Sequence, residues 1–219
     1  MKRAVDLSHE IADGTVTYPG LPAPRITEFL SRADSRFRYA AGTEFQIGRI
    51  EMVANTGTYL DTPFHRYAEG YDLAALPLER VADLPAVVVH DAMDGGRAIG
   101  PERLAGSLRR GCALLVHTGW DRHWGTAAYL GGSPFLTRAA CEAAVAAGVA
   151  LVGIDSVNLD DPDDGTRPAH SVLLAAGIPV VEHLTGLERL PAEGSRFFAV
   201  PPKVHGFGTF VVRAFAIVD

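Results

Sequence analysis

Three continuous apolar runs in the middle of the chain constrain its fold more than any other feature. They are residues 86–91, 112–117 and 149–155. Each run is short and rich in valine, leucine or alanine, which is typical of strands buried on both faces. Helical patterns lie between them: Pro101–Arg109 has proline at its first position, and Arg138–Ala147 is alanine-rich and stops at a glycine. Strands that alternate with helices, and then pair locally near both ends of the chain, predict an α/β protein with a mixed sheet.

Length and charge set limits on what kind of protein this is. A chain of 219 residues is expected to form a single domain spanning residues 1–219, with a sizeable core. The net charge of −6 and the absence of a basic patch argue against nucleic-acid binding. No apolar run has transmembrane length, and the N-terminal segment Met1–Leu7 lacks the apolar part of a signal peptide. We therefore expect a cytoplasmic protein that does not contact a membrane.

Two familiar nucleophile chemistries find no support. The chain has no Gly-x-Ser-x-Gly motif, which a serine hydrolase of the α/β type would need. Cys112 lies in an apolar strand and Cys141 in an alanine-rich helix, where inert core thiols are expected.

The most informative polar stretch runs from Asn55 to His65. It follows an alternating segment, residues 45–53, that predicts a strand. If the strand continues through Asp61, its period of two places four residues on one face. They are Asn55, Gly57, Tyr59 and Asp61. Gly57 would leave the middle of that face open to a ligand or metal.

Pro63 ends this strand and places Phe64 and His65 on the turn beyond it. A carboxylate on a strand and an imidazole on the next turn can converge on one small volume. The same residues also fit a polar strand end followed by a surface histidine, and these residues alone leave both interpretations open.

A second pair of polar residues, His170 and Glu182, lies further along the chain. Thr166 is predicted to cap a helix that has His170 in its first turn, where the helix dipole disfavours imidazolium and keeps the ring neutral. Glu182 ends an apolar strand, an unusual place for an unpaired carboxylate. A bound cation would explain the pair, and so would ordinary polar partners.

Two further polar segments are predicted to be loops. Residues 31–41 are arginine-rich and are expected to form a mobile loop. The acidic run 160–165 lacks the alternating spacing of a calcium-binding loop, so a solvated turn is expected there.

These residues together resemble the cyclase/kynurenine formamidase family of metal-dependent hydrolases. The family motif His-x-Gly-Thr-His-x-Asp-x-Pro-x-His is matched in register at five positions, Gly57, Thr58, Asp61, Pro63 and His65. An Ala-His pair followed by Gly-Ile-x-x-x-Glu is matched by residues 169–182. Asn55 and Tyr59 depart from the pattern, because both stand where the family has metal-binding histidines.

The resemblance implies a fold and a metal site. The fold would be a curved, barrel-like mixed β-sheet with helices outside it, of the swivelling β/β/α type. Asp61, His170 and Glu182 would hold one divalent ion, with zinc favoured over manganese. Asn55 and Tyr59 would leave the family's second metal position empty. Tyr59 would either donate a hydrogen bond toward the reacting water or simply fill space and bond to Asn55 or to the backbone.

The resemblance also implies an activity. The protein would be an arylformamidase-like hydrolase of a small amide, lactam or lactone, acting on C–N bonds other than peptide bonds, with a role in tryptophan catabolism. His65 would transfer the proton, and Tyr18, Phe64 and Trp120 would line the substrate cavity. Family habit suggests a homodimer or homotetramer. The alternative is a catalytically altered member that binds a small ligand, and metal content would distinguish the two.

Overall fold

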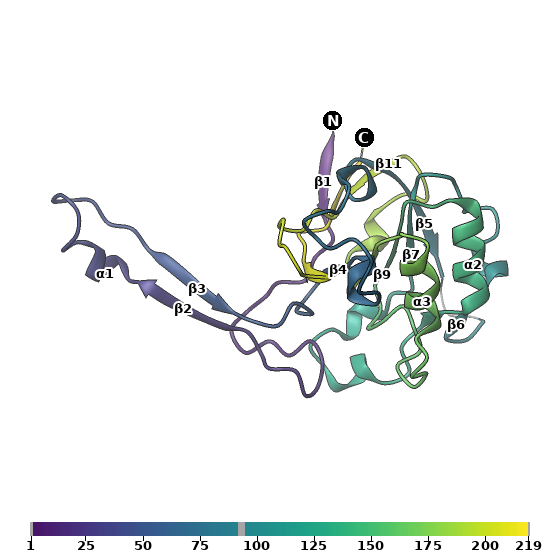
Figure 1. Cartoon of the computed structure of the whole chain (residues 1–219), viewed down its shortest axis with the longest axis horizontal. Coiled ribbons are helices and arrows are strands. Elements are labelled where there is room, and N and C mark those ends of the chain that lie inside the picture. The colour runs from purple at the N-terminus through teal and green to yellow at the C-terminus, as the bar shows by residue number, and fades with distance from the viewer. Residues whose placement is uncertain (1, 92–94, 219) are drawn as a thin grey trace.

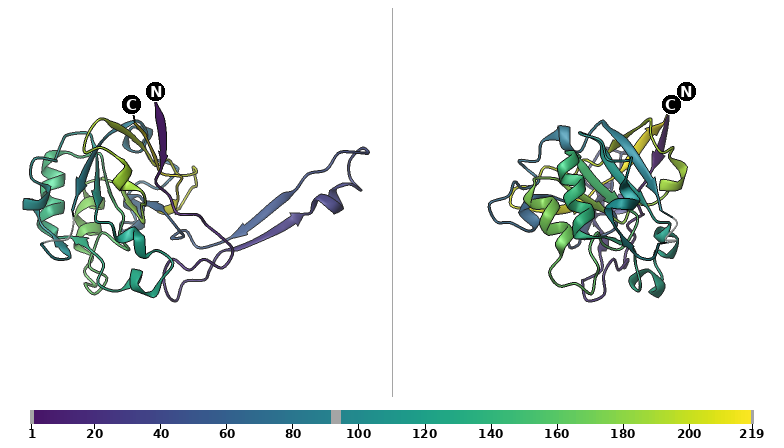
Figure 2. Two further views of the ribbon diagram at one scale, coloured as in Figure 1. Left: turned by 180° about the vertical axis from the view of Figure 1, so that it is seen from behind. Right: turned by 90° about the vertical axis from the view of Figure 1, so that its right-hand side faces the viewer.

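The molecule consists of a body built on one curled sheet and a two-stranded arm that projects from it (Figures 1 and 2). The structure is a computed structural model and describes residues 2–91 and 95–218. The main sheet has nine strands. In order across the sheet they are β1 (Arg3–Asp6), β13 (Phe215–Val218), β11 (Ser195–Phe198), β5 (Leu84–His90), β7 (Ala113–His117), β9 (Leu151–Ile154), β10 (Val180–Glu182), β4 (Tyr59–Asp61) and β12 (Thr209–Val211).

The sheet is mixed, as predicted. Strands β5, β7, β9 and β10 run parallel to one another, and antiparallel strands flank them on both sides. The strong curl of the sheet and the small number of helices confirm the predicted α/β fold with a barrel-like mixed sheet.

The central strands are apolar throughout because both of their faces are covered. Val88 and Leu115 belong to a core inside the curl, whereas their neighbours Val87 and Leu114 belong to a second core. That second core is completed by α2 (Arg138–Ala147) and α3 (Pro168–Ala175), which contact each other on the outer side of the sheet. The continuous apolar pattern follows from this burial on two sides.

The predicted helices were right in one case and wrong in another. Helix α2 has the predicted bounds, with the Thr137 side chain accepting a hydrogen bond from the Ala140 amide at 3.2 Å. The segment Pro101–Arg109 is not a helix but a single 3₁₀ turn, η3 (Pro101–Leu104). The chain leaves this turn in an extended conformation, and Gly106 then adopts a φ of 81°. A glycine in the left-handed region cannot continue a right-handed helix.

The remaining elements are short. They are η1 (Pro63–His65), η2 (Leu78–Arg80), η4 (Trp120–His123), η5 (Ala127–Leu130), η6 (Leu187–Arg189) and the paired strands β6 (Ala98–Ile99) and β8 (Phe135–Leu136).

The alternating segment 45–53 forms a strand as predicted, β3 (Ile47–Glu51), but this strand does not continue through Asp61. It belongs to a separate sheet, and the chain bends before β4 begins at Tyr59. Gly57 lies in the bend with a φ of 62°, and a Cβ atom there would come within 3.0 Å of Ile11. Gly57 therefore allows the bend and its packing, and does not open a face to a ligand as predicted.

The arm comprises residues 25–51. Strands β2 (Arg25–Leu30) and β3 pair antiparallel, and the short helix α1 (Arg32–Ser35) lies at its outer end. The Ser31 side chain accepts a hydrogen bond from the Asp34 amide at 3.1 Å and caps α1. The predicted loop 31–41 thus contains a turn of helix that the sequence analysis missed.

Both cysteines are buried free thiols, in agreement with their predicted core positions. None of the helices in the described part of the chain combines the length and apolar character needed to span a bilayer.

Candidate metal centre

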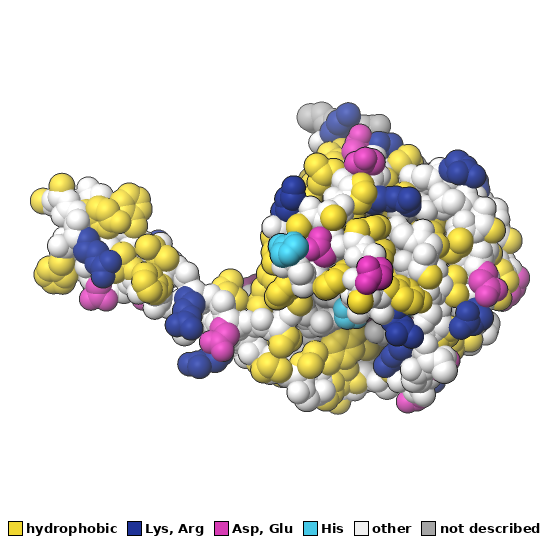
Figure 3. All heavy atoms as spheres, viewed as in Figure 1, with side chains coloured by type: hydrophobic (Ala, Val, Ile, Leu, Met, Phe, Trp, Pro, Cys, Tyr) yellow, Lys and Arg dark blue, Asp and Glu magenta, His cyan; other side chains and the backbone are white. Residues whose placement is uncertain are grey.

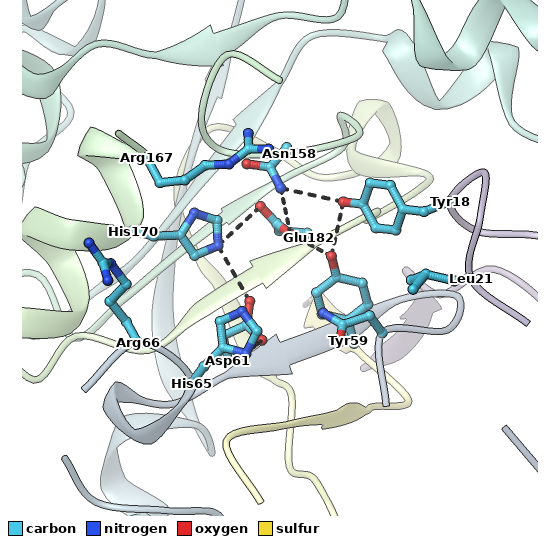
Figure 4. A pocket seen from close by; sticks show the side chains of 11 residues that line it. Tyr18, Leu21, Tyr59, Asp61, His65, Arg66, Asn158, Arg167, His170 and Glu182 are labelled. Atoms are coloured by element: carbon cyan, nitrogen blue, oxygen red, sulfur yellow. Dashed lines mark hydrogen bonds and ion pairs between the residues drawn. The ribbon is translucent and has the colours of Figure 1, made fainter. Parts of the chain in front are cut away.

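Asp61, His170 and Glu182 meet at a cavity of about 270 Å³ (Figure 4). Asp61 ends β4, His170 lies in the first turn of α3, and Glu182 ends β10. β4 and β10 are neighbours in the sheet, which brings the two carboxylates together. All three residues are buried, and each offers one ligand atom, with these atoms within 4.8 Å of one another.

The two oxygens of Asp61 have different surroundings. Oδ1 accepts a hydrogen bond from the Thr209 hydroxyl. Oδ2 is buried and, among the described residues, has no hydrogen-bond partner. Its neighbour His170 Nε2 lies 3.4 Å away and forms an ion pair with it when the ring is protonated. A buried carboxylate oxygen without a donor is costly, and a cation would satisfy it.

Glu182 is held by neutral donors. Its Oε1 accepts a hydrogen bond from the Leu159 amide at 2.7 Å, and its Oε2 accepts one from the Tyr59 hydroxyl at 2.7 Å. Burial raises the pKa of Glu182 to about 7, against the opposing effect of His170. A nearby cation would therefore stabilise the charged form of Glu182 relative to its neutral form.

The orientation of His170 is set by Asp160. The Asp160 carboxylate lies 2.6 Å from His170 Nδ1 and also accepts hydrogen bonds from the Ala169 and His170 amides. A carboxylate beside Nδ1 holds a proton there, so the Nε2 atom of a neutral ring presents its lone pair toward Asp61 and Glu182. This carboxylate–histidine arrangement is the usual one for a metal-binding imidazole.

Two sequence predictions about this segment are wrong. Asp160 was expected in a solvated turn but is fully buried, and it replaces the expected Thr166 cap by binding the first amides of α3. The helix dipole also does not keep His170 neutral. Burial lowers its pKa, but the charge of Glu182, with Asp160 and Asp61, raises it well above the usual value. A metal ion would displace a proton from this ring.

The spacing of the three ligands fits a divalent ion. His170 Nε2 lies 3.4 Å from Asp61 Oδ2 and 3.5 Å from Glu182 Oε1. Two ligands about 2.1 Å from a zinc ion at a tetrahedral angle are roughly 3.4 Å apart. The buried Asp61 oxygen, the direction of His170 Nε2 and this spacing all agree with a bound divalent ion, so the residues present fit such an ion.

Asn55 and Tyr59, at the positions of the family's other histidines, both line the cavity. Burial, followed by the charge of Glu182, raises the pKa of Tyr59 well above its usual value, so the phenol stays neutral and donates to Glu182. Its hydroxyl also lies 3.0 Å from that of Tyr18. Tyr59 therefore binds Glu182, a partner that neither of its two predicted roles included.

His65 lies beside the three ligands, on η1. The Thr209 hydroxyl donates its one proton to Asp61, so it can only accept from His65 Nδ1, which lies 2.7 Å away. The proton of a neutral His65 ring is therefore on Nδ1, and Nε2 is free to accept a proton. The ring lines the cavity and is 38% exposed, as a proton carrier must be.

The predicted substrate-binding residues are only partly brought together. Tyr18 lines the cavity, whereas Phe64 and Trp120 are not among its lining residues. The Trp120 indole donates to the Tyr129 carbonyl at 2.8 Å and is thereby held in its own loop. Phe64 occupies the middle of η1, whose following residue, His65, lines the cavity in its place.

Sequence reasoning missed several lining residues, namely Leu21, Arg66, Asn158 and Arg167. Arg66 directly follows the matched motif and Arg167 directly precedes the Pro-Ala-His step, so their closeness to motif residues was the available signal. Asn158 gave no signal of its own; it lies on the loop after β9, where its Nδ2 is 3.4 Å from Glu182.

We predict that Asp160→Asn weakens metal binding about 10–100-fold, the usual effect of removing a partner that orients a metal-binding histidine. An amide cannot hold the Nδ1 proton as a carboxylate does, although it preserves volume. Competition titration with a chromogenic chelator measures the affinity. Asp163→Asn, in the exposed part of the same loop, is the control. Equal affinities for Asp160→Asn and the parent would contradict this role.

Comparison with known proteins agrees with the fold. The family model Cyclase, described as "Putative cyclase", matches residues 5–161. The kynurenine formamidase of Salinibacter ruber (strain DSM 13855 / M31) is 28% identical over 215 residues, which cover 96% of this chain and 95% of that protein.

Solved structures share the architecture over the whole chain. Isatin hydrolase A from Labrenzia aggregata, bound to benzyl benzoate, has a TM-score of 0.85 at 25% identity, covering 99% of this chain and 94% of its own. An isatin hydrolase bound to the product analogue thioisatinate has a TM-score of 0.86 at 22% identity. The match covers 99% of this chain and 92% of that chain. The second likeness shows a common fold. Because the matched model spans well over half of the sequence, the chain belongs to the cyclase family.

Proposed function

We propose that this protein is a metal-dependent hydrolase that cleaves the C–N bond of a small amide or lactam. Asp61, His170 and Glu182 hold one divalent ion, and the buried, unpartnered Asp61 Oδ2 is the observation that carries the proposal. One imidazole and two carboxylates suit zinc better than manganese, which prefers sites made of oxygen ligands.

The ion and the side chains would have different roles in hydrolysis of the amide. When bound, the ion polarises the amide carbonyl and makes water more acidic. His65 Nε2 accepts one proton from the attacking water and passes it to the leaving nitrogen, so the amide and water become an acid and an amine. The Thr209 hydroxyl keeps the acceptor nitrogen of His65 free. Asn158 and Tyr59 hold Glu182 in place.

The substrate we propose is an aryl formamide or a related lactam, in tryptophan catabolism. This rests on the names of the relatives, a kynurenine formamidase and isatin hydrolases. The cavity size of about 270 Å³ supports a substrate of this size.

Hydrolysis of formanilide, measured together with elemental analysis, tests the proposal. We expect about one zinc per chain, loss of hydrolysis after treatment with a chelator, and recovery on adding zinc. Hydrolysis that does not depend on metal would contradict it.

The altered residues Asn55 and Tyr59 lead to a prediction about stoichiometry. A buried neutral phenol and an amide are poor ligands, so the parent is expected to bind one ion. Replacing both, in Asn55→His with Tyr59→His, is expected to add a second ion because both positions line the same cavity as Asp61 and Glu182. Elemental analysis counts the ions, with Asn55→Gln and Tyr59→Phe as the control pair. Two tightly bound ions in the parent would contradict this prediction.

The second candidate function is a ligand-binding protein that has lost hydrolysis. The observation in its favour is the bond from Tyr59 to Glu182, which satisfies one metal ligand with a neutral donor. Metal-loaded protein that binds anilide compounds without hydrolysing them would favour this function.

A further inference from the structure

Two arginines, Arg66 and Arg167, line the cavity that contains the three metal ligands. Figure 4 shows them on the α3 side of the cavity, on either side of His170. Tyr18 and Leu21 lie on the opposite side. The cavity thus has one cationic side and one side that carries an aromatic ring and an aliphatic chain.

Neither guanidinium forms an ion pair with a carboxylate in the described part of the chain. Arg66 Nε donates to the Ser171 hydroxyl at 3.5 Å, and its guanidinium lies 5.6 Å from the centre of the Tyr67 ring. Arg167 Nη1 donates to the Asp161 carbonyl at 3.1 Å. Each contact positions the group and uses one of its five N–H donors at most, so most donors remain for a ligand.

The charge balance of the cavity also favours an anionic ligand. Asp61 and Glu182 supply two negative charges, which one divalent ion would balance. Arg66 and Arg167 then bring two further positive charges to the edge of a small cavity, and only Arg167 lies close enough to a carboxyl outside the cavity, that of Asp164, to lower its pKa. Such a pair favours a carboxylate, which a guanidinium can bind through two parallel hydrogen bonds.

We propose that Arg66 and Arg167 form a carboxylate subsite, so that the preferred substrate is an amide carrying a carboxylate a few bonds from the scissile carbonyl. This rests on the hydrolase function proposed above. The carbonyl lies at the metal centre, the carboxylate at the arginines, and the rest of the substrate toward Tyr18 and Leu21.

A matched pair of substrates tests the subsite. N-formylanthranilate and formanilide share the scissile bond and the ring and differ by one carboxylate. Formate release by the zinc-loaded parent is expected to favour N-formylanthranilate in kcat/KM. Arg66→Gln and Arg167→Gln are each expected to lower kcat/KM for N-formylanthranilate about 10–100-fold, the usual loss for a charged hydrogen bond. Formanilide should change much less. Arg138→Gln, a surface variant on α2, is the control.

Binding supplies a readout that does not depend on turnover. Calorimetry with anthranilate and aniline on the zinc-loaded parent and variants shows whether the arginines hold the carboxylate. Equal losses for both substrates, or no loss of anthranilate binding in either variant, would overturn the subsite. If neither substrate is hydrolysed, the hydrolase proposal fails, and calorimetry still decides the subsite.

Outside this cavity, the arm carries seven of the thirteen exposed large hydrophobic residues in the described chain. They are Ile26, Phe29, Phe37, Tyr39, Phe45, Ile47 and Ile50. Figure 3 shows hydrophobic side chains gathered at the outer end of the arm, away from the body. The arm is where the homodimer or homotetramer suggested by the family resemblance would be expected to form its contact.

Discussion

Asp61→Asn is expected to lose its bound metal and, with it, measurable hydrolysis. Asparagine keeps the shape of the side chain and still accepts a hydrogen bond from Thr209, but it replaces the only charged ligand supplied by β4. Zinc sites in small folded units contribute about 10–16 kcal/mol in total, or roughly 3 kcal/mol for each ligand. The affinity should therefore fall more than about 100-fold. Elemental analysis after dialysis measures the loss directly.

A matched variant separates loss of a ligand from a general change of charge. Asp163→Asn removes one carboxylate from an exposed loop and should keep its metal. Asp61→Asn should also keep the fold, because the side chain retains its volume. Retention of metal by Asp61→Asn at the parent's affinity would remove Asp61 from the site.

His65→Ala is expected to retain the ion but to lose turnover about 10²–10⁴-fold, the usual range for general acid–base catalysis. The His65 side chain lies near the ligands without being one of them, since its Nδ1 is 3.7 Å from Asp61 Oδ1 and is bonded to Thr209. Parallel measurements of kcat and metal content separate the two effects.

Two comparisons sharpen this test. His205→Ala removes an almost fully exposed imidazole and should leave turnover unchanged. Thr209→Val removes the partner that fixes the proton on His65 Nδ1, so a smaller loss of kcat is expected while the ring remains. Full turnover by His65→Ala would exclude His65 from proton transfer.

The central helix and strands could be predicted because the residues that determine them lie within or next to each element. Helix α2 has a capping threonine and a terminal glycine, and the continuous apolar strands report burial on both faces. The segment 45–53 was predicted as a strand and is one, but the alternation of residue types could not reveal that the chain bends before Asp61. Here the bend depends on Gly57 packing against Ile11, a contact between segments distant in sequence.

The same distinction holds at the candidate site. Asp61, His170 and Glu182 follow recognisable patterns and lie together in the structure. Asp160 was not predicted, because nothing in an acidic run marks which carboxylate turns inward to meet a helix. Arg66 and Arg167 were missed for a related reason: only the fold reveals which charged neighbours of a motif line the same cavity as the motif residues.

The Asp160 carboxylate binds the imidazole of His170 and two amides of the first turn of α3. The ring and the helix therefore cannot reorient independently. The entropy of fixing the imidazole is lost when the chain folds, and it does not need to be lost again when an ion arrives. The His170 imidazole is therefore fixed in direction as well as in position. Ions whose preferred bond angles differ from this direction would bind less tightly. Discrimination among metals at this centre would then come from a residue that never contacts the ion.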